Sequence, residues 1–148
     1  SLAECNKILE ASDIRQSFKE NFAKNALVQE ALIAAKRGDF ETAMAKADEH
    51  LAKIQSGNNP NEVEDHHNLI GLIQFEKGDH SKAIEHLSQG DQEDPYILYY
   101  IAVSEAKAGN KTRATELFKN VAERNDNSLA YAFVRSKAID AQKMAGKK

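Results

Sequence analysis

The sequence predicts an all-α fold, built as a solenoid of antiparallel helix pairs. Two prolines and seven glycines among 148 residues, together with abundant Ala, Leu, Glu and Lys, favour helices over strands. Gly38, Gly78 and Gly109 recur at spacings of 40 and 31 residues, and each is followed by Asp or Asn. Such a glycine can end one helix in the left-handed conformation, and the next side chain can cap the following helix. Because one hairpin cannot bury its apolar surface alone, we expect the hairpins to stack.

The chain opens with a helical lead-in over residues 1–22. Phe18 and Phe22 are four positions apart there and share one helical face. The first hairpin follows, with one helix expected at 24–37 and its partner at 41–54. Apolar residues recur in both segments at helical spacing, which marks the faces that pack into the core.

The central hairpin begins with a strong start signal. Asn59 can cap a helix whose first position is Pro60. This helix runs to the turn at Gly78, and its partner helix follows the turn directly. Gly71 and Ala83 are small, so we expect the two backbones to approach closely at these positions.

The third hairpin repeats the same signals. The dipeptide Asp94-Pro95 starts a helix expected at 95–108, and a second helix is expected at 111–124 after the turn. Ser128 then caps a last helix to about residue 144, which covers the open end of the stack. The residues expected on its inward side are Ala130, Phe133, Val134, Ala138 and Ala141.

Six short motifs of the central hairpin indicate a family. They are Ile70-Gly71, Gly78-Asp79, Ala83, Leu87, Gly90 and Pro95. At these residues the chain resembles the tetratricopeptide repeat family, over roughly residues 24–127. The resemblance implies a right-handed superhelical solenoid that serves as a protein-interaction module. We divide the chain into the lead-in at 1–22, three hairpins at 23–127, and a capping helix with a basic tail at 128–148.

A second apolar face on the helix that starts at Pro95 indicates where a partner could bind. One face of this helix suffices for packing within the stack, and the other carries tyrosines, which suit surfaces that are sometimes dry and sometimes wet. In the family, the first helix of each hairpin lines a concave groove for a peptide or helix. The candidate groove residues are Asn68, Leu72, Phe75, Tyr96, Tyr99, Tyr100 and Val103. Alternatively, the N-terminal helix covers them, or a second protomer does, in which case the chain is a homo-oligomeric assembly scaffold.

The chemistry of the expected partner follows from one subtype of the family. Some members grip a C-terminal carboxylate with lysine, asparagine and arginine side chains. The matching positions here are Val28, Leu32, Leu69, Tyr96 and Tyr100, none of which pairs with a carboxylate. The resemblance therefore implies a protein or peptide partner with apolar or aromatic groups rather than an acidic tail.

Catalytic and metal chemistry find little support in the sequence. Asp65, His66 and His67 could begin a metal site with Glu62 or His86, which leaves a metal-dependent enzyme as a remote alternative. However, neighbouring helical residues point about 100° apart, so adjacent histidines do not easily share an ion. The sequence lacks a glycine-rich phosphate loop, a nucleophile elbow and a Cys–His pair with a supporting carboxylate. We therefore expect no enzyme activity, metal or cofactor.

Charge and hydropathy exclude further classes of partner. A net charge of −3 gives no reason to expect nucleic acid. No apolar run approaches the roughly 20 residues that span a bilayer, so we expect a soluble chain without membrane insertion. Because the sequence begins at Ser1 rather than Met, we expect an excised or processed form. The compartment is unknown, with the cytoplasm favoured, since a signal or anchor could precede Ser1.

Overall fold

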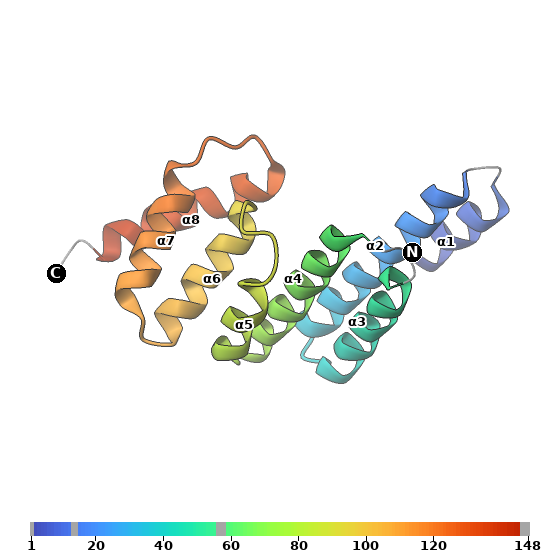
Figure 1. Cartoon of the computed structure of the whole chain (residues 1–148), viewed down its shortest axis with the longest axis horizontal. Coiled ribbons are helices and arrows are strands. Elements are labelled where there is room, and N and C mark those ends of the chain that lie inside the picture. The colour runs from blue at the N-terminus through green and yellow to red at the C-terminus, as the bar shows by residue number, and fades with distance from the viewer. Residues whose placement is uncertain (1, 13–14, 56–58, 146–148) are drawn as a thin grey trace.

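The computed structural model describes residues 2–12, 15–55 and 59–145. Over these ranges the chain is helical, with no strand. The helices are α1 (Leu2–Ala11), α2 (Gln16–Lys36), α3 (Phe40–Ile54), α4 (Pro60–Lys77), α5 (His80–Leu87), α6 (Pro95–Lys107), α7 (Lys111–Glu123) and α8 (Leu129–Ala145). The predicted all-α fold is confirmed, and α1 and α8 lie at opposite ends of a row (Figure 1).

The helices pack as hairpins stacked in chain order. The pairs α2 with α3, α4 with α5, and α6 with α7 are the three predicted hairpins, and each packs against the next. The first helices of successive hairpins also touch, because the backbone of α4 contacts those of α2 and α6, and α6 contacts α8. Within the described residues, α3, α5 and α7 make no such contact with one another. We call α2, α4, α6 and α8 the even-numbered row; the right-handed superhelical sense of the stack remains a prediction.

The three turns have the predicted backbone conformation. Gly38, Gly78 and Gly109 have φ values of 80°, 85° and 92°, which L side chains rarely adopt. After the first two glycines, the carboxylates of Asp39 and Asp79 accept hydrogen bonds from backbone N–H groups three residues on, at 3.1 and 3.2 Å. The predicted combination of turn and cap is confirmed at both places.

The third turn differs in its cap. Asn110 occupies the N-cap position of α7 but makes no side-chain capping bond. Its Nδ2 atom instead donates to Glu105 Oε2, near the end of α6, at 2.6 Å. A hydrogen bond to a charged carboxylate is stronger than the hydrogen bond that a neutral amide makes as a helix cap. The prediction of an asparagine cap at this turn is therefore wrong.

A matched pair of substitutions tests this assignment. The Asp94 carboxylate caps α6 by accepting from Tyr96 N at 2.8 Å, so Asp94→Ala should lower the free energy of unfolding by about 1 kcal/mol. Asn110→Ala at the start of α7 should cost clearly less, because it removes no cap. Urea unfolding of both variants measures the difference, and equal losses would contradict the assignment.

The close approach predicted for the central hairpin is also present. Leu87 of α5 is fully buried and lies against Gly71 of α4. A methyl group on Gly71 would come within 2.5 Å of Leu87 Cγ. Ala83 is fully buried as well. The small residues therefore lie where two packed helices leave no space for a larger side chain.

Two expectations at the ends of the chain are wrong. The helix expected at 24–37 begins at Gln16, so Phe18 lies on α2, where it is exposed. On α8 the side chain of Phe133 is 62% exposed, and Tyr131 is buried in its place. The Tyr131 hydroxyl donates to the carbonyl oxygen of Arg124. Tyr131, Val134 and Ala138 form the buried face of α8, and Phe133 lies outside that face.

Candidate functional site

Helix α6 carries most of the candidate site and lies in the even-numbered row. Its inner face contributes Ile97, Leu98, Ile101 and Ala102 to the core of the second half of the chain. The remaining apolar side chains of the helix are only partly buried and pack on the edge of that core. They include Tyr96, Tyr99, Tyr100 and Val103, with Leu72 joining them from α4.

The aromatic rings form one connected group. Phe75 of α4 meets Tyr100 edge-to-face, with ring centroids 4.8 Å apart and planes at 88°. The ring centroids of Tyr96 and Tyr100 are also 4.8 Å apart, and the Tyr96 hydroxyl donates to the Tyr100 hydroxyl at 3.3 Å. Tyr99 packs against Tyr100 at 5.6 Å. Edge-to-face contacts of this kind hold each ring in a defined orientation.

Two phenols in this group, those of Tyr99 and Tyr100, have a raised pKa. Burial raises the pKa of Tyr99, and burial together with the bond to Tyr96 raises the pKa of Tyr100. Tyr99 also contacts Phe118 of α7, with ring centroids 5.9 Å apart. The group therefore presents half-buried, uncharged rings on a packed base, a surface suited to apolar and aromatic contacts.

Asn68 does not join the rings. Its Oδ1 atom lies where a side chain on Gly90 would be, because a Cβ built there would come within 1.7 Å of it. This oxygen is buried and accepts no hydrogen bond. Asn68 of α4 therefore packs against Gly90, just after the end of α5.

The N-terminal helix does not cover the candidate groove. Among the described helices, α1 contacts only α2, at the far end of the row from α6 (Figure 1). The alternative in which this helix fills the groove is therefore wrong.

Four histidines form a cluster, of which sequence analysis had grouped His66, His67 and His86 but had missed His50; His50 and His66 are buried, and the other two are half-buried. His50 of α3 stacks on His66 of α4, with ring centroids 5.8 Å apart. His67 meets His86 of α5, where the two Nδ1 atoms are 3.3 Å apart, and the rings of His66 and His67 link the two pairs at 6.4 Å. His50 lies seven positions after Ala43 on the buried stripe of α3. That spacing is the signal that could have revealed it.

These histidines do not assemble a metal centre with neighbouring acidic groups. Within the described ranges, no three His, Cys, Asp or Glu side chains come together to hold an ion.

No helix in the same part of the chain is both long and apolar enough to cross a bilayer.

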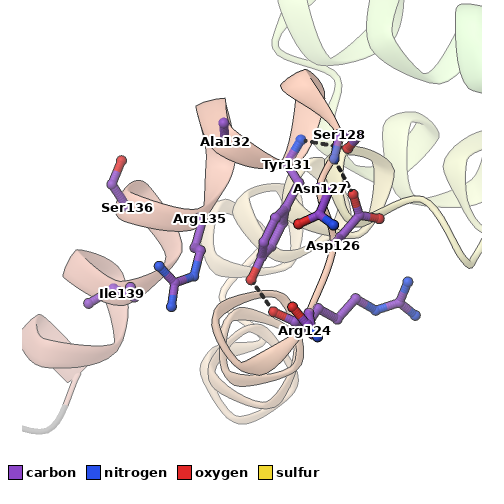
Figure 2. A pocket seen from close by; sticks show the side chains of 10 residues that line it. Arg124, Asp126, Asn127, Ser128, Tyr131, Ala132, Arg135, Ser136 and Ile139 are labelled. Carbon is purple, nitrogen blue, oxygen red and sulfur yellow. Dashed lines mark hydrogen bonds between the residues drawn. The ribbon is translucent and has the colours of Figure 1, made fainter.

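A cavity of about 610 Å³ lies where α7 connects to α8. It is lined by the connecting residues 124–128 and by one face of α8 (Figure 2). Arg135 projects from α8 between Tyr131 and Ile139. Sequence analysis did not find this site, because its walls come from a helix and a loop whose relative placement depends on tertiary packing.

Comparison with known proteins bears on the third hairpin. Residues 96–128 match the family model of the tetratricopeptide repeat, which covers most of α6, all of α7 and the connection to α8. The predicted resemblance is confirmed, although the match falls on the third hairpin rather than the central one. No curated protein and no solved structure matches the chain.

Proposed function

Since a tetratricopeptide repeat spans residues 96–128 of this chain, we propose that the chain is a protein-interaction module whose partner binds along the rings of α4 and α6. The proposed binding surface comprises Leu72, Phe75, Tyr96, Tyr99, Tyr100 and Val103. The partner contributes a peptide or helix with apolar or aromatic side chains. Asn68, which packs against Gly90, has no part in this surface.

The observation that supports the proposal is the connected ring group. Its members are fixed by contacts between them and by the core beneath, so little side-chain entropy remains to be lost on binding. Tyrosine is enriched among the residues that dominate interface energies. The surface also lies in the even-numbered row, whose helices contact one another while, among the described residues, α3, α5 and α7 do not. A stack with this contact pattern curves toward the even-numbered row, which favours a concave surface there.

Tetratricopeptide repeats typically serve as scaffolds rather than enzymes, and the proposal assigns no reaction to the chain. The carboxylates near the rings are those of helix caps and surface ion pairs, such as Glu76 with Lys36. A scaffold role therefore needs no chemistry beyond contact.

The test removes the ring surface and measures partner capture. Tyr99→Ala combined with Tyr100→Ala should weaken binding to the protein captured by the wild-type chain by about thirtyfold or more, because centrally placed tyrosines of an interface each contribute up to several kcal/mol. Capture from a cell extract identifies the protein, and titration with that purified protein gives the affinity.

Two controls keep the result interpretable. Arg113 lies on the exposed face of α7, so Arg113→Ala should leave the affinity for the partner unchanged. Tyr100 also packs against the core, so its removal could weaken folding as well as binding. Tyr100→Phe keeps the ring, and thermal unfolding of each variant shows whether the fold is retained. Unchanged affinity in a folded double variant would remove the proposal. Light scattering over a dilution series distinguishes it from self-assembly through the same rings.

A further inference from the structure

Helix α8 ends the row with an apolar face that no described helix covers. Leu129, Phe133 and Met144 are 76%, 62% and 72% exposed. Leu129 and Phe133 are four positions apart and form an apolar stripe near the start of the helix, whereas the charged Asp140 lies on the same face between Phe133 and Met144. The opposite side of α8 packs on α6 and α7. A helix that only covers the end of a stack needs a polar outer face, so this apolar stripe requires a different explanation.

The cavity beside this stripe contains an unpaired cation. Arg124 pairs with Glu93 at 3.1 Å, and the Asp126 carboxylate accepts from Ser128 N at 2.6 Å. Arg135, by contrast, has no carboxylate partner among the described residues. Figure 2 shows it in the cavity wall, next to Tyr131. The remaining polar groups of the wall are amides and hydroxyls, from Asn125, Asn127, Ser128 and Ser136.

The cavity and the stripe are continuous on the helix surface. Ala132 and Ser136 line the cavity and lie three and seven positions after Leu129, which brings them next to the stripe on the helix. A ligand in the cavity would therefore reach Leu129 and Phe133 without crossing a charged ridge. The combined surface offers the exposed guanidinium of Arg135 and the exposed apolar side chains of Leu129 and Phe133.

We propose that this face of α8, with its cavity, is a second docking surface for a partner protein. The partner contributes a peptide segment in which an acidic side chain adjoins apolar ones. The carboxylate binds the guanidinium of Arg135, whose planar donors match a carboxylate in two parallel hydrogen bonds. The apolar side chains cover Leu129 and Phe133. This surface is separate from the rings of α4 and α6, so the two can be occupied independently.

A selection experiment tests the proposal before any partner has been identified. The whole chain is immobilised and used to select peptides from a phage-displayed random library. Peptides that bind the wild-type chain should contain Asp or Glu beside apolar residues. Their affinity should fall about tenfold for Arg135→Gln, which corresponds to the loss of one charge-assisted hydrogen-bonding group. Backbone amide shifts on binding should concentrate at residues 124–139.

Matched variants control for charge and folding. Lys119→Gln removes a charge from the exposed surface of α7 and should leave affinity unchanged, while Phe133→Ser should weaken binding without altering the thermal midpoint. The proposal is overturned if the selected peptides lack carboxylates, if Arg135→Gln binds them as well as wild type, or if their shifts fall on the rings of α6. Self-association through α8, seen as a mass that doubles with concentration and is lost in Phe133→Ser, would also overturn it.

Discussion

Gly71→Ala is expected to lower the free energy of unfolding by about 1–2 kcal/mol, although alanine is the better helix former. At an open helical position the same change would stabilise by up to about 1 kcal/mol. Here the new Cβ would lie 2.5 and 2.6 Å from the Cγ and Cδ2 atoms of Leu87, and 3.0 Å from its backbone nitrogen. Since overpacking a dense core costs about 1–3 kcal/mol, the steric cost outweighs the gain in helix propensity.

The neighbouring side chain cannot move away easily. Leu87 is fully buried and belongs to the core cluster that continues into α6, α7 and α8. Any shift of Leu87 therefore disturbs the joint between the second and third hairpins. The effect should appear in global unfolding rather than in local fraying of α5.

A double-mutant cycle makes the prediction sharp. Leu87→Ala alone should cost about 2–5 kcal/mol, because it leaves a cavity in the core. In the Leu87→Ala background the methyl group added by Gly71→Ala occupies part of that cavity. The second substitution should then be neutral or stabilising. Urea unfolding of the four proteins should give a coupling energy above about 1 kcal/mol, whereas additive effects would show that Gly71 and Leu87 do not constrain each other.

The close contact of Gly71 was predictable from the sequence because its causes are local and recurrent. A glycine within a helical pattern, a turn glycine seven residues later and an alanine in the partner helix together specify how the hairpin closes. The positive φ at Gly78 and the cap at Asp79 follow from the same short segment. Helix existence and the starts at Pro60 and Pro95 were predictable for this reason.

Other features depend on side chains that meet across elements, and the sequence alone did not reveal them. Asn110 had the right position for a cap, but Glu105 of the preceding helix competes for its amide. Phe133 had the right period for the core, but Tyr131 is buried in its place. Only the packed structure shows Asn68 against Gly90 rather than beside the tyrosines.

The buried histidine cluster is the clearest case of such a feature, and it predicts a loss of stability in mild acid. Burial lowers the pKa of His50, His66 and His86. The Nδ1 atoms of His50 and His66 are buried without a hydrogen-bond partner. His86 also faces His67, with the two Nδ1 atoms 3.3 Å apart, and the nearby ring adds to the effect of burial in lowering the pKa of His86.

The direction of the effect follows from proton linkage. Below the ordinary histidine pKa of 6.5 the unfolded chain binds protons that the folded chain does not, so the free energy of unfolding falls as pH falls through this value. The loss ends once pH drops below the lowered pKa values. The charges that face His50 change the size of its pKa shift but not its direction. Asp65 and Glu62 oppose the lowering of the His50 pKa, and Lys24 adds to it. For His66, the opposing charge is Asp48.

Carboxylates act in a different pH window. Burial raises the pKa of Asp65 above its ordinary 3.8, so its protonation favours the folded state as pH falls through the range just above that value. The pKa of the capping carboxylate of Asp79 is lowered by the backbone hydrogen bond from Lys82. Its contribution is lost only in stronger acid. The histidine effect should therefore stand alone between pH of about 7.5 and 5.5.

Thermal unfolding across this range measures the prediction. The wild-type midpoint should be lower at the acid end, and His50→Gln with His66→Gln should reduce the difference. Arg113→Ala, on the exposed face of α7, is the control, and it should retain the wild-type pH dependence. Proton NMR titration of the histidine rings in the folded wild-type chain gives the three pKa values directly. Values for His50 and His66 at or above 6.5 would contradict the argument, because burial would then carry no penalty for the charged ring.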